Sequence, residues 1–206
     1  MESGESKALP GIVLAAGAGR RFGQNKLLLP LRGHPVLYRT LRTALEAPLD
    51  PVLLVVGFEA EKALAALEEL KDSPKLCILL NDHWEQGRAS SLKLALRALP
   101  PDAPGALVLL GDMPLMTSDL VARVVNAFLK TRKLCFPIYQ GEAGRPVALP
   151  KSLFAEFERL QGDESGLKIL QRYWEDAVKL ALAPHEEPTQ WDVDTPEDMD
   201  RILKAF

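Results

Sequence analysis

Apolar runs and helical segments alternate through the first two thirds of this chain, and this order restricts the fold more than any other feature of the sequence. The apolar runs are nearly continuous, as in strands buried on both faces of a sheet. The segments between them place leucine and alanine three or four residues apart, which predicts amphipathic helices. We therefore expect an α/β fold, a mainly parallel, Rossmann-like sheet with helices on both faces. The expected strands are 11–14, 51–57, 75–80 and 106–110, and the expected helices are 35–47, 59–71, 89–99 and 118–130.

The regular alternation ends after residue 130, and a small antiparallel excursion is expected there. Gly141 and Gly144 lie between two apolar runs and predict the turn that joins them. A final helix is expected from Thr195, because Thr-Pro-Glu-Asp supplies an N-cap, a proline at the first helical position and acids in the first turn. The excursion strands are 134–140 and 145–149, followed by helices at 152–160 and 165–174 and a strand at 178–183.

The composition fits one ordinary globular domain. Of the 206 residues, 47% are hydrophobic and 26% are charged, which allows a sizeable core. We expect a single domain over residues 9–206 after a flexible N-terminus at 1–8. The net charge of −3 argues against a nucleic-acid partner, and no apolar run is long enough to span a membrane, so a cytoplasmic protein is expected. Cys77 and Cys135 fall in expected strands and are expected to be buried free thiols.

A loop rich in glycine and cations follows the first expected strand. It runs from Ala15 to Lys26 and contains three glycines and three cations. Glycine lets backbone N–H groups approach a phosphate, and the cations supply charge for its oxygens. The loop therefore predicts a polyanion site, although a strand-to-helix turn with solvated basic residues remains the alternative. It is neither a Walker A loop, because Leu27 follows the lysine, nor a dinucleotide fingerprint, because Phe22 stands where a third glycine belongs.

Polar residues also follow two later strands. Asn81 comes directly after 75–80, and Gly111 and Asp112 come directly after 106–110. The carboxyl ends of parallel strands form the ligand crevice of an open α/β sheet, so these residues are expected to meet the glycine loop at one edge. Asn81 offers both a donor and an acceptor to a base or ribose. Mg²⁺ prefers carboxylate, phosphate and water oxygens, which makes Asp112 a candidate ligand, although it could merely begin a turn.

Two further groups of polar residues belong to the expected site. Asp192 and Asp194 project to the same side of an extended segment, with Val193 between them facing inward, and one of them could be the second Mg²⁺ ligand. Both could instead stabilise the N-terminus of the last helix. The serines at 90–91 open a helix, where serine is commonly an N-cap, and Arg88 beside them is an alternative anion partner.

Taken together, these motifs resemble the signatures of the molybdenum cofactor cytidylyltransferase family. The first signature, Leu-Ala-Ala-Gly-x-x-x-Arg-Met/Phe-Gly-x-x-Lys-Leu, matches the chain over 14–27, and Leu-Gly-Asp-Met-Pro-Leu matches at 110–115. The matches cover nearly the whole chain in order. The remaining ones are Asn-Asp-His-Trp and Ser-Ser-Leu within 81–92, Gly-Arg-Pro at 144–146, Gly-Asp at 162–163 and Asp-Val-Asp-Thr-Pro-Glu-Asp at 192–198.

The resemblance implies a nucleotide-diphospho-sugar transferase-like fold and a nucleotidyltransferase activity. By this resemblance the enzyme transfers CMP from CTP to the phosphate of molybdenum-molybdopterin, which releases pyrophosphate and forms the molybdopterin cytosine dinucleotide cofactor. Mg²⁺ is the implied cofactor, held by Asp112 and Asp194, and a molybdoenzyme or its chaperone is a further implied partner. Lys26, Arg21 and Asp112 are the implied catalytic residues. The implied nucleotide-binding residues are Leu14, Ala15, Ala16, Gly17, Gly19, Arg20, Lys26, Asn81, Ser91 and Gly111.

The choice of nucleotide and the identity of the acceptor depend on a few positions in the sequence. Ala16 favours CTP, because guanylyl-transferring relatives more often have Leu-Ala-Gly-Gly. The stretch 162–166 departs from the family's Gly-Asp-x-Gly, which affects acceptor recognition more than nucleotide binding. The alternatives are guanylyl or other nucleotidyl transfer to a different small phosphorylated acceptor, such as a sugar or polyol phosphate, and a non-catalytic nucleotide- or cofactor-binding protein. A Rossmann-type oxidoreductase is disfavoured, because Phe22 breaks the glycine pattern and only Glu59 follows the second strand as a ribose-binding acid.

Overall fold

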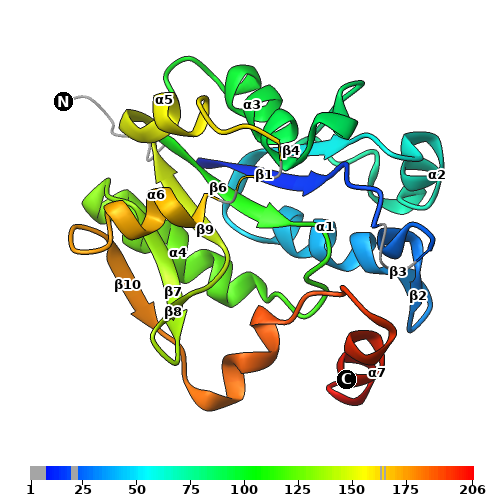
Figure 1. The fold of residues 1–206 in the computed structure, drawn as a ribbon. Helices are drawn as coiled ribbons and strands as arrows, with labels where there is room; N and C mark the ends of the chain where they lie inside the picture. Colours follow the sequence, from blue (N-terminus) through cyan, green and yellow to red (C-terminus); the bar gives the residue numbers. More distant parts are fainter. Residues whose placement is uncertain (1–7, 20–22, 163, 165) are drawn as a thin grey trace.

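The computed structural model describes residues 8–19, 23–162, 164 and 166–206, and its centre is a sheet of eight strands (Figure 1). The strands are β1 (Leu9–Ala15), β4 (Leu49–Val56), β5 (Leu76–Leu80), β6 (Gly105–Leu110), β7 (Cys135–Tyr139), β8 (Glu142–Ala143), β9 (Val147–Pro150) and β10 (Val178–Ala181). Their order across the sheet is β10-β7-β9-β6-β1-β4-β5, with β8 paired to β7. Neighbours from β6 to β5 are parallel, as are β7 and β10, whereas β9 runs antiparallel to β6 and β7. The predicted mainly parallel sheet with an antiparallel excursion is confirmed.

Helices cover both faces of this sheet. The α-helices are α1 (Val36–Glu46), α2 (Ala60–Ala65), α3 (Arg88–Ala98), α4 (Ser118–Thr131), α5 (Phe154–Phe157), α6 (Leu167–Arg172) and α7 (Pro196–Lys204). The 3₁₀ helices are η2 (Lys26–Leu28), η3 (Glu68–Leu70), η4 (Trp84–Gln86), η5 (Lys151–Leu153) and η6 (Pro184–Gln190), and β2 (Pro30–Leu31) pairs with β3 (His34–Pro35). Successive strand residues face opposite sides, so Ile12 and Val13 of β1 enter different cores. One core contains residues of α1, α4 and α7, and the other contains residues of α3, α5 and α6, as Figure 1 shows for α1 and α3.

Two of the predicted helices are each divided into two shorter elements. The single helix expected over 59–71 is wrong, because α2 ends early and η3 follows it. Leu67, between the two helices, is buried in the core, and Leu64 and Leu70 pack against it, so the apolar positions that predicted one helix still face the core. The helix expected over 152–160 is likewise divided into η5 and α5.

The expectation that both cysteines are buried is wrong for one of them. Both thiols are free, and Cys135 is buried in β7, but Cys77 is exposed in β5. The reason is the place of β5, which forms an edge of the sheet, so that Ile78 and Leu80 are also exposed. Pro35 also differs from the prediction, because it lies in β3 and precedes the first residue of α1.

The start of the last helix is confirmed. Thr195 is the N-cap of α7, since its Oγ1 accepts a hydrogen bond from Asp198 N at 3.2 Å while the Asp198 carboxylate accepts one from Thr195 N at 2.9 Å. Pro196 is the first helical residue. This cap fixes the direction of the segment that precedes it, 192–194. No helix in the described parts of the chain is long and apolar enough to cross a membrane.

Candidate active site

A cavity of about 510 Å³ opens at the carboxyl ends of β1 and β6, within the size range of small-molecule sites. The loop after β1, η4, the start of α3, the end of β6 and the segment before α7 contribute to its walls. Of the predicted site residues, Arg20 and Arg21 lie outside the described part of the chain. The predicted residues that line the cavity are Leu14, Ala15, Ala16, Gly17, Gly19, Lys26, Ser91, Asp112 and Asp194.

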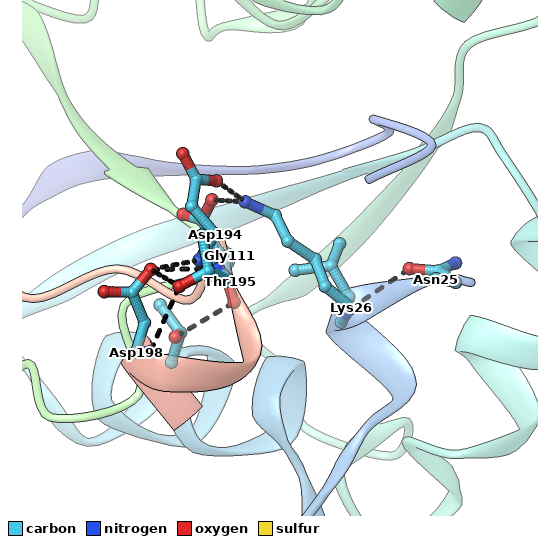
Figure 2. Close-up of polar contacts among 9 residues, drawn as sticks. Asn25, Lys26, Gly111, Asp194, Thr195 and Asp198 are labelled. Atoms are coloured by element: carbon cyan, nitrogen blue, oxygen red, sulfur yellow. Dashed lines mark hydrogen bonds and ion pairs between the residues drawn. The ribbon is translucent and has the colours of Figure 1, made fainter. Parts of the chain in front are cut away.

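The backbone of the loop requires glycine at one position and anchors Lys26. Gly19 has a φ of +57°, and a Cβ there would lie 3.1 Å from Lys26 Cγ. Asn25 is buried and caps η2, because its Oδ1 accepts a hydrogen bond from Leu27 N at 3.2 Å. Its Nδ2 donates to Phe58 O at 3.4 Å, which ties the loop to the chain that follows β4. Lys26 therefore enters the cavity from a well-anchored backbone (Figure 2).

The ammonium group of Lys26 lies between two carboxylates. Its Nζ donates to Asp112 Oδ2 and to Asp194 Oδ1, each at 2.6 Å, and Figure 2 shows the Lys26 side chain pointing toward Asp194. The Lys26 side chain is only 14% exposed, so these contacts are poorly screened by solvent. Burial alone would lower the pKa of Lys26, but the two carboxylates outweigh it and raise the pKa above the ordinary value. Lys26 is therefore a fixed positive charge at the cavity floor.

A third carboxylate completes an acidic cluster around this lysine. Ligand oxygens of Asp112, Asp192 and Asp194 lie within 4.8 Å of one another. Burial raises the pKa of Asp192, and the charges of the other two aspartates raise it further. Asp112 Oδ1 is buried and has no hydrogen-bond partner among the residues that the structure describes. An unsatisfied buried carboxylate oxygen beside two more carboxylates fits a hard divalent cation, for which these three residues would be the ligands.

The segments that carry the carboxylates are held together by backbone contacts. Val193 is fully buried, as predicted, and its N–H donates to Asp112 O at 3.0 Å. Gly111 donates its N–H to Leu14 O at 2.9 Å, and its carbonyl accepts a hydrogen bond from Thr40 Oγ1 at 3.2 Å. A Cβ at Gly111 would lie 3.0 Å from Leu37 Cδ1 and 3.1 Å from Leu14 O, so a larger residue would force small shifts in its neighbours. These contacts place Asp112 beside the loop.

Asn81 does not line this cavity but contacts a residue that does. Its buried side chain donates to Ser90 Oγ and Ser91 Oγ, both at 2.9 Å, and accepts a hydrogen bond from His83 N at 3.0 Å. Asn81 lines a separate cavity, whereas Ser91 lines the main one. A role of Asn81 in nucleotide binding, which the sequence predicts, would therefore act through the position of Ser91.

Sequence reasoning weighed one member of the cluster too lightly. It preferred Asp194 over Asp192 as a metal ligand, whereas the structure brings both to Asp112. The signal was available, because residues two apart in an extended segment project to the same side. Glu85, which also lines the cavity, carried no recognisable signal in the sequence.

Comparisons with known proteins place this arrangement in a class: the protein is a nucleotidyltransferase. The chain belongs to the family of MobA-like NTP transferase domains, whose model matches residues 11–178. The purine catabolism protein PucB of Bacillus subtilis (strain 168) is 30% identical over 210 residues, which cover 98% of each chain. Nicotine blue oxidoreductase of Paenarthrobacter nicotinovorans is 29% identical over 203 residues, which cover 94% of this chain and 95% of that protein.

Two solved structures share the fold of this chain over nearly its whole length. Rv0371c from Mycobacterium tuberculosis H37Rv matches with a TM-score of 0.81 and 29% identity, over 96% of this chain and 97% of that one. The complex of Rv0371c with manganese matches with a TM-score of 0.79 and 28% identity, over 97% of this chain and 100% of that one. The acidic cluster and this neighbour agree with the general use of divalent metals by nucleotidyltransferases.

Proposed function

We propose that this enzyme transfers CMP from CTP to the phosphate of a molybdopterin-type acceptor and releases pyrophosphate. The observation that carries the proposal is the acidic cluster with Lys26 on the floor of a nucleotide-sized cavity. The choice of CTP is supported by Ala16, which stands where guanylyl-transferring relatives more often have glycine, and by Ser91 in the cavity wall. The molybdopterin acceptor is supported by the ordered series of sequence signatures over the whole chain.

In the proposed reaction, an oxygen of the acceptor phosphate attacks the α-phosphorus of CTP, and the bond to the bridging oxygen of the β-phosphate breaks. Pyrophosphate leaves with that oxygen, and no covalent intermediate with the protein is needed. Glycine N–H groups of the loop and Lys26 would hold the triphosphate, with Arg21 sharing its charge. Asp112, Asp192 and Asp194 would hold Mg²⁺, which when bound neutralises phosphate charge and polarises the reacting phosphoryl group.

Redox chemistry is the second candidate, because a relative that matches over almost the full length is named nicotine blue oxidoreductase. The loop offers a cradle for phosphates in either case. It lacks the third glycine of a dinucleotide fingerprint, since Phe22 stands there, and this favours a nucleoside triphosphate.

The test is pyrophosphate release from CTP, GTP, ATP and UTP, each with and without molybdenum cofactor. We expect release from CTP that depends on the cofactor, because a pocket that pairs with one base leaves polar groups unpaired against another. Equal rates with CTP and GTP would refute the base preference. Release with a different phosphorylated acceptor but not with molybdenum cofactor would refute the acceptor. Oxidation of NADPH by the same preparation would favour the redox alternative.

A further inference from the structure

A second, smaller cavity adjoins the main one. It has a volume of about 60 Å³ and shares the residues Leu14, Arg88 and Leu110 with the nucleotide-sized cavity. Its other walls are largely apolar and include Val147 and Phe157. A planar or apolar group seated there would therefore lie directly beside the acidic cluster's cavity. The sequence singled out Arg88 here as an alternative anion partner but predicted no cavity.

Arg145 also lines the second cavity, and its backbone is clamped by a distant side chain. Arg145 N donates to Gln190 Oε1 at 2.7 Å, and Gln190 Nε2 donates back to Arg145 O at 2.9 Å. A Cβ at Gly144 would lie 2.2 Å from Gln190 Oε1, so only glycine allows this approach. Gln190 Nε2 also donates to Thr189 Oγ1 at 3.0 Å, which steadies the clamp. The position of Arg145 is therefore fixed by the tertiary structure rather than by its own loop.

Most N–H donors of the Arg145 guanidinium group make no hydrogen bond to the described residues. The Arg145 side chain is half-buried and carries five N–H donors. Within the described part of the chain it makes one hydrogen bond, from Nη1 to Gly144 O at 3.2 Å. Burial lowers the pKa of Arg145, and the charge of Arg88 lowers it further, while the Asp112 and Asp192 carboxylates oppose this. Glu164 also lines the cavity, and its carboxylate accepts a hydrogen bond from Gln161 N. Two neighbouring guanidinium groups favour an anion between them.

The in-line geometry of phosphoryl chemistry favours a second anion site of this kind. The attacking and leaving oxygens lie roughly in line through the α-phosphorus, so the acceptor phosphate and the departing pyrophosphate need separate partners. Lys26 and the glycine loop account for the triphosphate. Arg145 lines the second cavity, which shares residues with the cavity of the acidic cluster, so Arg145 lies beside the cavity that contains Asp112 and Asp194.

We propose that Arg145 and Arg88 bind the phosphate of the acceptor, and that the second cavity receives the planar or apolar part of the molecule that carries it. The acceptor class is thus a phosphate monoester with a flat or apolar body. Gln190 acts as a positioning residue, since it holds the backbone of Arg145. This assignment rests on the proposed function in one respect, namely that the acceptor carries a phosphate.

The closing experiment measures binding of phenyl phosphate and of inorganic phosphate by calorimetry, in the absence of nucleotide and metal. We expect the wild type to bind phenyl phosphate more tightly than inorganic phosphate, because only the former fills the cavity. Arg145→Gln should weaken phenyl phosphate binding about tenfold or more, the scale of charged hydrogen bonds. Arg145→Lys should be intermediate, because it keeps the charge but loses the fork. Arg42→Gln, which removes the same charge from the exposed side of α1, should bind like the wild type.

These outcomes separate the assignment from the proposed function. Unchanged phenyl phosphate binding in Arg145→Gln and Arg145→Lys would overturn the role of Arg145, and equal binding of the two probes by the wild type would overturn the role of the cavity. Thermal unfolding of each variant checks that the fold is kept, and Arg145→Lys serves if Arg145→Gln is unstable. Neither CTP preference nor the identity of the natural acceptor enters the measurement, so a failure of the proposed function leaves its result unaffected.

Discussion

The two ends of the candidate site are built in different ways. The glycine loop and Asp112 directly follow the parallel strands β1 and β6, so the topology alone brings them to one edge. Arg145 precedes the antiparallel strand β9 and is held by Gln190, 45 residues later in the chain. The first end thus depends on motifs beside strands, and the second depends on a tertiary contact. Substitutions at the first end should impair nucleotide chemistry, and those at the second should impair acceptor binding.

The largest effect is expected from Asp112→Asn. The change is nearly isosteric but removes the charge at the centre of the acidic cluster, so we expect pyrophosphate release to fall by about a thousandfold, as several kcal/mol of metal assistance implies. The rate at saturating Mg²⁺ and the thermal midpoint are measured together. Asp119→Asn, on the exposed side of α4, is the matched control. A near-normal rate in Asp112→Asn would show that this residue does not hold the metal.

The next effect is expected from Lys26→Ala, which should lower kcat/KM for CTP by about a hundredfold, the scale of one preorganised charge. The same variant should bind Mn²⁺ more tightly than the wild type when nucleotide is absent, because Lys26 Nζ otherwise lies between Asp112 and Asp194. Electron paramagnetic resonance of free Mn²⁺ measures this. Lys62→Ala, an exposed lysine of α2, controls for the lost charge. If Mn²⁺ affinity stays the same, the lysine does not compete with the metal.

The contrast between local motifs and tertiary contacts also explains which features could be predicted from the sequence. The parallel sheet, the loop with Lys26, Asp112 and the cap at Thr195 follow from local patterns and were predicted. The exposure of Cys77 was not, because it depends on which strand lies at the edge of the sheet. The clamp of Arg145 by Gln190 was not either, since no local rule pairs an amide side chain with a backbone so far away in the sequence.

A smaller effect is expected at the other end from Gln190→Ala. Loss of two hydrogen bonds to the Arg145 backbone, at about 1 kcal/mol each, should raise KM for the acceptor about thirtyfold. KM for CTP should stay within about twofold, because an effect carried through Arg145 concerns the acceptor side alone. Gln171→Ala, exposed on α6, is the control. Equal rises in both KM values would mean that Gln190 supports the whole site rather than the position of Arg145.

The smallest effect concerns the pH dependence of metal binding. The pKa of Asp192 lies above its ordinary value of 3.8, because burial and the Asp112 and Asp194 charges disfavour its ionised form. A carboxylate must be deprotonated to bind a metal. As the pH is lowered, Mn²⁺ affinity should therefore begin to fall at a higher pH than it would if Asp192 had an ordinary pKa. Between the ordinary and the raised pKa the folded protein binds more protons than the unfolded chain, so this group's contribution to the stability of the metal-free protein falls as pH rises.

Asp192→Asn removes this titrating group and should lower Mn²⁺ affinity. In the variant, the change in Mn²⁺ affinity between low and neutral pH should be a few-fold smaller than in the wild type. The difference in thermal midpoint between the wild type and Asp192→Asn, both free of metal, should shift in favour of the wild type as the pH is lowered through the same window. Asp200→Asn, exposed on α7, controls for the lost charge. Parallel pH profiles of Mn²⁺ affinity in the wild type and Asp192→Asn would exclude Asp192 from the cluster's titration.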